Sequence, residues 1–171
     1  MKKLFVIALA VFSVNSVLAQ APEITFEHGD KIIKGFMSKK ELESDSSLKW
    51  YAQNLKGYTP EANAIKAFKE NKETINIIAF GGTWCSDTQN LLPKFFALTD
   101  AAGFSQDRVT LLGVDRSKKT IQHLAEAFNV INVPTFIVMK DGKEIGRVVE
   151  YGKYGMVDKE LGEIIIGAST K

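Results

Sequence analysis

The sequence has one cysteine, Cys85, among its 171 residues, so no disulfide can form within the chain. A lone cysteine has three ordinary uses: a reactive thiol, a disulfide to a second molecule, or a small buried apolar side chain. The second use includes a disulfide-linked dimer of this chain through Cys85. The count of one therefore excludes a disulfide-stapled scaffold and leaves these three uses open.

Histidine is also scarce. His28 and His123 are the only two, they lie far apart in the sequence, and neither has cysteine or carboxylate neighbours at metal-ligand spacing. A nucleophilic pair of either histidine with Cys85 is not favoured. The chain has no phosphate-binding loop and no dinucleotide fingerprint. We therefore expect neither a metal site nor a bound cofactor.

The N-terminus has the features of a secretory signal peptide. Two lysines, Lys2 and Lys3, precede the apolar run 4–12, and a small-x-small cleavage site ends at Ala19. The run is shorter than the roughly 20 residues that cross a bilayer. We predict a signal peptide over residues 1–19, export to the periplasm, and no membrane anchor after cleavage. The two lysines account for the formal charge of +2, so nothing indicates a nucleic-acid partner.

The rest of the chain has the length of one domain with an N-terminal elaboration. Residues 20–58 are predicted to be a mostly helical extension, with an irregular or strand-containing lead-in over 20–37. Residues 59–171 are predicted to form the main domain, in which buried strands alternate with amphipathic helices. The expected strands are 75–80, 109–114, 135–139 and 144–149. One helix is expected to start at Thr59, with an apolar side through Phe68, and the others are expected over 85–102, 117–128 and 157–166.

Cys85 lies where a buried strand is expected to meet a helix. The apolar run 75–80 precedes it, and the helix is expected to begin at Cys85 itself. A helix N-terminus favours negative charge, so this position favours the reactive thiolate. A hydroxyl hydrogen bond from Thr88 to the sulfur would add to this effect, while the carboxylate of Asp87 would oppose it.

Several motifs in order resemble the thioredoxin superfamily over roughly residues 60–166. Trp84-Cys85 stands at the strand-to-helix turn, Pro93 lies inside the following helix, Val133-Pro134 precedes a strand, and Asp141-Gly142 marks a hairpin. The resemblance implies a three-layer α/β fold, in which a central mixed sheet has helices on both faces. It also implies a cis peptide bond before Pro134, with that proline lying against the thiol.

The sequence departs from that family at three positions. Thr88 stands where thioredoxins have their second, resolving cysteine. Ala79 and Leu111 stand where the family has a buried acid and its lysine partner. A site without the resolving thiol and the acid lacks one half of the dithiol cycle.

The resemblance then implies thiol–disulfide exchange by one cysteine. Cys85 would be the nucleophile and Thr88 would tune it, while Trp84, Val133 and Pro134 would shape the substrate groove. Partners would be protein or low-molecular-weight thiols and disulfides, and an external thiol would release the mixed disulfide. Such chemistry suits disulfide isomerisation or deglutathionylation.

Two other functions remain open at this level. The chain is alternatively a non-catalytic binding module that keeps the groove around a vestigial thiol, in which case function would survive Cys85→Ser. A thiol peroxidase is less favoured, because the threonine and arginine arrangement of such enzymes is not found around Cys85.

Overall fold

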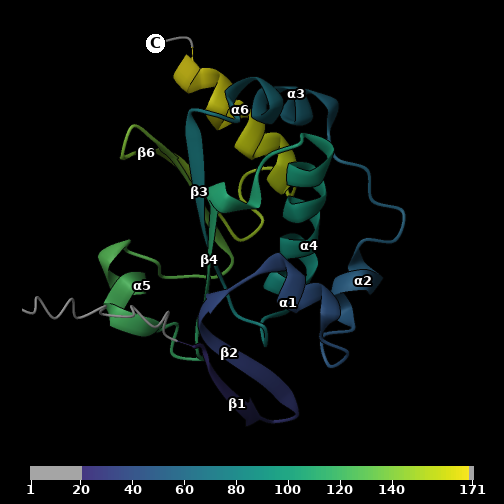
Figure 1. Cartoon of the computed structure of the whole chain (residues 1–171), viewed down its shortest axis with the longest axis vertical. Coiled ribbons are helices and arrows are strands. Elements are labelled where there is room, and N and C mark those ends of the chain that lie inside the picture. The colour runs from purple at the N-terminus through teal and green to yellow at the C-terminus, as the bar shows by residue number, and fades with distance from the viewer. Residues whose placement is uncertain (1–20, 170–171) are drawn as a thin grey trace, which may run out of the picture.

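A six-stranded mixed sheet runs through residues 21–169, the part of the chain that the computed structural model describes (Figure 1). The predicted signal peptide, 1–19, lies outside this range. The strands lie in the order β1-β2-β4-β3-β5-β6, and β3 and β4 are the one parallel pair among them. Their bounds are β1 Glu23–Glu27, β2 Asp30–Met37, β3 Ile75–Gly81, β4 Val109–Gly113, β5 Thr135–Lys140 and β6 Lys143–Val149.

Two helices, those that begin at Lys39 and Ala62, start at a side-chain cap. Ser38 and Glu41 form a capping box: the Ser38 hydroxyl accepts from the Glu41 N–H, and the Glu41 carboxylate accepts from the Ser38 N–H. The expected start at Thr59 is wrong by two residues, because the Glu61 carboxylate caps that helix by accepting from the Ala64 N–H. The helices are α1 Lys39–Ser44, α2 Trp50–Asn54, α3 Ala62–Asn71, α4 Ser86–Ala101, α5 Leu124–Ala127 and α6 Val157–Ser169, with short 3-10 turns η1 Gln106–Arg108 and η2 Ile121–His123.

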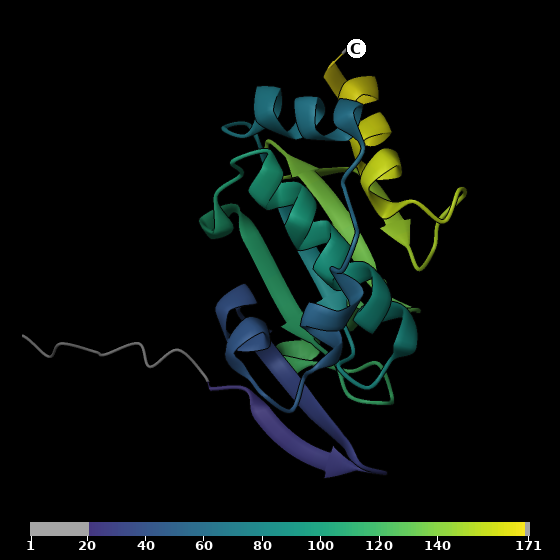
Figure 2. The same cartoon turned by 90° about the vertical axis from the view of Figure 1, so that its right-hand side faces the viewer.

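The two faces of the sheet are covered very differently. α3, α4 and α6 cover one face and α5 covers the other, on opposite sides of the sheet in Figure 1. Figure 2 shows α4 running along the first face. The predicted three-layer α/β fold is therefore confirmed. No helix within residues 21–169 is long and apolar enough to cross a membrane.

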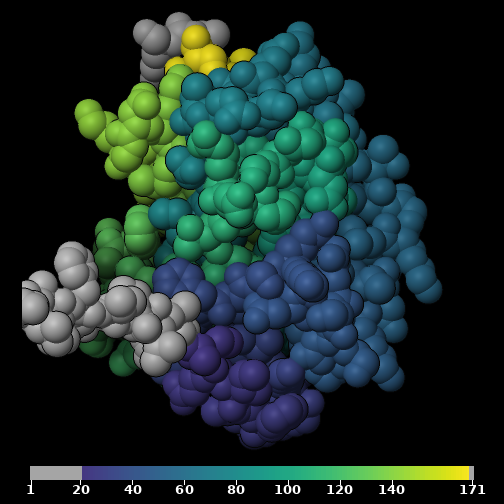
Figure 3. Space-filling view, viewed as in Figure 1, coloured from purple at the N-terminus to yellow at the C-terminus, as the bar shows by residue number. Residues whose placement is uncertain are grey.

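The N-terminal extension joins the same sheet. β1 and β2 form an antiparallel hairpin, and β2 pairs with β4 through Gly35–Gly113 and its neighbours. Strand takes up more of the described part of residues 20–58 than helix does, so "mostly helical" is wrong for this segment. The reason is that Ile32 and Ile33 are buried on opposite sides of β2 beside the open edge of β4. In Figure 3 the extension covers the lower part of the face in view.

The expected helix over 117–128 is wrong over residues 117–120 and is broken into two short pieces after them. Lys118, Gln122 and His123 have positive φ, which interrupts a right-handed helix. Asp115 closes a turn over the first part: its C=O accepts from the Lys118 N–H and its carboxylate from the Lys119 N–H. What remains helical is η2 and the four-residue α5.

Candidate functional site

Cys85 is the residue immediately before the first turn of α4. Its backbone is extended, with φ −89° and ψ 124°. Its N–H donates to Gly82 C=O at 2.9 Å, and its C=O accepts from the Gln89 N–H at 2.9 Å. The first bond closes the turn that connects β3 to α4, and the second begins the helix. The thiol is therefore partly exposed at the N-terminal end of a 16-residue helix.

The structure brings Cys85 together with Val133 and Pro134, 48 residues further along the chain. The Sγ of Cys85 donates to the backbone carbonyl of Val133 at 3.3 Å. The Val133–Pro134 peptide bond is cis, and both side chains are buried. Val133 therefore presents its backbone, rather than its side chain, to the thiol.

The Trp84 side chain is half-buried. Its indole Nε1 donates to the Val114 carbonyl at 3.0 Å, and the ring lies so close over Gly82 that a Cβ there would be 2.7 Å from it. The guanidinium carbon of Arg116 lies 5.3 Å from the ring centroid, within cation–π range. The ring is thus fixed by one hydrogen bond, one backbone contact and one cation.

Thr88 does not occupy the position that the sequence predicted for it. Its side chain is fully buried, and its hydroxyl oxygen accepts from the Gly82 N–H at 3.2 Å. Its methyl group lies against Gly81, where a Cβ would be 2.8 Å away. Among the described residues, the Cys85 thiol bonds to the Val133 carbonyl. Thr88 does not bond to the sulfur and instead holds the backbone of the turn.

The interior next to the site is apolar. Ala79 on β3 and Leu111 on β4 are partners in the parallel register and are both buried. The positions at which the family carries an acid and a lysine are therefore neighbours here too, and both are filled by hydrocarbon. No ionisable group at this pair can move a proton to or from the sulfur.

Sequence reasoning missed two residues of this region. Thr83 is buried, and its hydroxyl donates to the Lys31 carbonyl at 2.6 Å and accepts from the Ile33 N–H at 3.3 Å. Arg116, in the loop after β4, lies over the ring of Trp84. Both contacts join segments more than 30 residues apart, so no local pattern could have indicated them.

The histidines stay outside this arrangement. His28 lies in the β1–β2 turn with positive φ, and His123 has an exposed side chain whose Nδ1 lies 3.7 Å from a carboxylate oxygen of Glu126. Across residues 21–169, no group of three or more His, Cys, Asp or Glu side chains is arranged to hold a metal ion.

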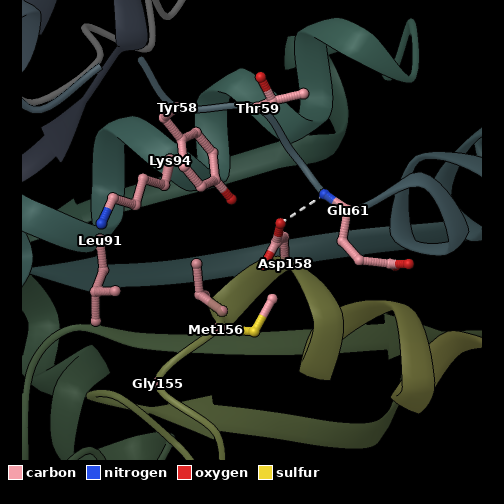
Figure 4. A pocket seen from close by; sticks show the side chains of 9 residues that line it. Tyr58, Thr59, Glu61, Leu91, Lys94, Gly155, Met156 and Asp158 are labelled. Carbon is pink, nitrogen blue, oxygen red and sulfur yellow. Dashed lines mark hydrogen bonds between the residues drawn. The ribbon is translucent and has the colours of Figure 1, made fainter. Parts of the chain in front are cut away.

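A separate pocket of about 290 Å³ lies between α4, the 58–61 segment and the start of α6 (Figure 4). The buried Asp158 accepts from the Glu61 N–H at 2.8 Å there. Burial, followed by the Asp158 carboxylate, raises the pKa of Tyr58, and the Lys94 ammonium lies 5.6 Å from the Tyr58 ring centroid. Cys85 does not line this pocket, so it is distinct from the thiol site.

The sequence is similar to those of known thioredoxins. The thioredoxin family model matches residues 60–160. Thioredoxin H2 of Arabidopsis thaliana is 32% identical over 84 residues, which cover 48% of this chain and 59% of that protein. Thioredoxin of Chlamydia muridarum is 34% identical over 84 residues, covering 49% of this chain and 72% of that one. The chain thus spans little more than half of the plant protein.

Two solved structures are similar to this chain. An HIV epitope-scaffold protein has a TM-score of 0.52 at 15% identity, covering 77% of this chain and 99% of that one. Fasciola hepatica thioredoxin is 29% identical, with a TM-score of 0.40 and coverage of 60% and 88%. Family model, sequence relatives and sheet topology point the same way: the chain belongs to the thioredoxin family.

Proposed function

We propose that this chain is an exported, periplasmic protein that carries out thiol–disulfide exchange with Cys85 as its one nucleophile. The observation that supports this is the position of the sulfur. It is partly exposed at the start of α4 and lies 3.3 Å from the carbonyl before the cis proline. A buried inert cysteine would need neither feature.

The exchange proceeds in two balanced steps. The Cys85 thiolate attacks one sulfur of a substrate disulfide, forms a mixed disulfide with it, and releases the other sulfur as a thiolate. An external thiolate then attacks the mixed disulfide and releases Cys85 as a thiolate again. Thr88 cannot supply that second sulfur, so glutathione, a second substrate thiol or a partner oxidoreductase does.

The cycle suits isomerisation and deglutathionylation. In isomerisation the second thiol of the substrate resolves the intermediate, and no net oxidation or reduction occurs. In deglutathionylation Cys85 takes the glutathione from a protein, and a second glutathione leaves with it as the oxidised disulfide. A second copy of this chain could serve as the thiol partner, which would give a dimer linked through Cys85.

Recognition of a protein substrate would use the backbone of Val133, next to the sulfur. An extended peptide can add to exposed backbone groups as an extra strand, and Val133 presents its backbone beside the thiol. Pro134 fixes that segment, and the exposed part of the Trp84 ring gives an apolar wall. Thr88 acts indirectly, by holding the Gly82 backbone under the turn.

The test is a trapping experiment with the mature protein. Oxidised glutathione and a scrambled disulfide protein are each mixed with the wild type, and adducts are read by mass spectrometry. We expect one glutathione or one substrate chain per molecule, lost on addition of excess thiol. Cys85→Ser should form none, while Ser86→Ala serves as a matched control on the neighbouring exposed position. Adducts on Cys85→Ser, or none on the wild type, would exclude the mechanism.

A second candidate is a binding module with a vestigial thiol. The apolar Ala79–Leu111 pair favours it, since no proton carrier remains behind the sulfur. In that case a bound peptide would be retained equally by the wild type and Cys85→Ser, under reducing conditions.

A further inference from the structure

The N-terminal hairpin is bonded to the turn that carries the thiol. Thr83 is the second residue of the turn closed by the Cys85 N–H and the Gly82 carbonyl. Its buried hydroxyl bonds to β2 in both directions, donating to Lys31 and accepting from Ile33. A single side chain therefore fixes the turn against two backbone groups of the hairpin.

The hairpin also reaches the ring of Trp84. Arg116 lies over that ring, and its guanidinium is bonded to the hairpin end: Nε lies 3.4 Å from a Glu27 carboxylate oxygen, and Nη2 lies 2.5 Å from an Asp30 oxygen. Because the hairpin supplies both anions, it sets where the guanidinium sits. The position of the cation in turn limits the tilt of the indole.

A third connection comes from α2. The side chain of Gln89, in the first turns of α4, donates to the Thr83 carbonyl at 2.8 Å. Asn54 donates to the Gln89 carbonyl at 2.9 Å. Thr83 is thus held at its hydroxyl by β2 and at its carbonyl by α4, and α4 is held there by α2.

These contacts share one origin. The hairpin and α2 belong to residues 20–58, which precede the segment matched by the thioredoxin family model, 60–160. The thiol, its turn and the cis-proline segment lie inside that match. The site loop is therefore fixed by a part of the chain that the family model does not include.

We propose that the β1–β2 hairpin positions the Trp84–Cys85 turn, with Thr83 and Arg116 as its two positioning residues. This inference deepens the proposed function, because it concerns the same thiol. Thr83 holds the backbone of the turn, which determines how Cys85 meets the N-terminus of α4. Arg116 holds the ring, which determines the apolar wall beside the sulfur. Neither residue touches the reacting atoms.

The test measures the environment of Trp84 and the reactivity of Cys85 separately, in the full mature chain. A Trp50→Phe background leaves Trp84 as the one tryptophan, since the sequence has two. Thr83→Val removes the hydroxyl at nearly constant volume, Thr83→Ser keeps it, and Thr25→Val removes an exposed hydroxyl from β1 as a control. The readouts are Trp84 emission and the rate of Cys85 alkylation by iodoacetamide from pH 5 to pH 10.

We expect Thr83→Val to shift the Trp84 emission and to change the alkylation rate at neutral pH by about threefold or more. The rate should change because the fraction of thiolate depends on how the sulfur is placed at the helix N-terminus. Thr83→Ser should restore both readouts, and Thr25→Val should change neither. Arg116→Gln, on a half-exposed side chain, should alter Trp84 emission and its quenching by iodide while the alkylation rate changes by less than about twofold.

The outcomes separate this inference from the proposed function. If Thr83→Val is folded and matches its background in both readouts, the positioning role is wrong. If Thr83→Val does not fold, Arg116→Gln decides: unchanged Trp84 emission and quenching would overturn the proposal. Neither readout needs a substrate disulfide. A wild type that forms no mixed disulfide would therefore remove the proposed function and leave the positioning result standing.

Discussion

The two faces of the sheet differ in what they hold. The face under α3, α4 and α6 carries a large, continuous apolar cluster that includes Phe68, Phe95 and Phe136. The face under α5 carries a much smaller cluster around Phe80 and Ile137. We refer to them as the thick face and the thin face.

The thiol site belongs to the thin face. Trp84 and Cys85 pack against its cluster from the edge, and Val133 is one of its buried members. The helix that presents the thiol, α4, is buried in the thick face along its length. The fold thus places the reactive group on the lightly packed side and anchors its helix on the heavily packed side. Substitutions on the thick face should change stability, and those on the thin face should change the site.

The largest effect is expected from Phe95→Ala on the thick face. Phe95 is fully buried, with ring centroids of Phe96 and Phe136 at 5.1 and 5.0 Å. Losing such a side chain costs about 3–5 kcal/mol of unfolding free energy, measurable by urea unfolding. Phe128→Ala is the counterpart on the thin face, where the ring is half-buried and 5.9 Å from Phe80. We expect it to cost about half as much. Equal losses would contradict the difference between the faces.

The next effect comes from placing an acid in the apolar interior. Ala79→Asp puts a carboxyl group among buried thick-face residues beside Leu111, and an unpaired buried charge costs about 3 kcal/mol or more. Burial raises the folded-state pKa of such a carboxyl above its unfolded value. The part of the destabilisation that is due to charge is therefore absent at pH values below the unfolded pKa and grows as the pH rises toward the folded one.

Urea unfolding of Ala79→Asp at pH 4 and pH 8 measures this growth. Leu111→Lys in the same molecule supplies the opposite charge at the register partner and should recover part of the loss at pH 8. A double variant no more stable than the sum of the single changes would show that the two side chains do not meet.

Much of the fold follows from local signals in the sequence. The apolar run of β3, the capping box of Ser38 and the Asp141-Gly142 turn were all predictable, because each depends on neighbours along the chain. Asp141 and Gly142 indeed have positive φ at the β5–β6 turn. The thiol's place at the start of α4 was predictable for the same reason.

The supports of the site were not predictable. Thr83 bonds to residues about 50 positions earlier, and Arg116 to residues more than 80 positions earlier. Thr88 stands at the right spacing to face the sulfur, yet the turn directs its hydroxyl to Gly82. These outcomes depend on how the hairpin meets the sheet, which sequence spacing does not encode.

A smaller effect is expected at Thr88. Thr88→Val would leave the buried Gly82 N–H without its acceptor, which costs about 1–3 kcal/mol. Thr88→Ser keeps the acceptor and loses the methyl group on Gly81, at about 1 kcal/mol. Urea unfolding gives both values, and alkylation of Cys85 is measured in parallel. If Thr88 acts through the turn, the alkylation rate follows the Gly82 bond and recovers in Thr88→Ser. Destabilisation by Ser greater than by Val would contradict this.

The smallest effect concerns how the hairpin is tied to α1. Lys31 on β2 bonds to Asp45 after α1, and the Ser47 N–H and hydroxyl also donate to that carboxylate. The Lys31 hydrogen bond, followed by that of Ser47, lowers the pKa of Asp45 to about 2. A lowered folded-state pKa gives stability that is present above the unfolded value and is lost as the pH falls toward 2. Because the pair is partly exposed, its worth is under about 1 kcal/mol.

Unfolding free energies measured from pH 6 down to pH 2 should therefore decline less in Asp45→Asn than in the wild type. Asp141→Asn, on the exposed β5–β6 turn, is the matched control and should follow the wild-type curve. If Thr83 and Arg116 alone carry the effect of the hairpin on the site, Trp84 emission in the Trp50→Phe background should stay constant in Asp45→Asn. The reason is that Thr83 bonds to the Lys31 carbonyl, whereas Asp45 bonds to the Lys31 side chain. A shift in the Trp84 emission would mean that the bond between the hairpin and Asp45 also helps to position the site.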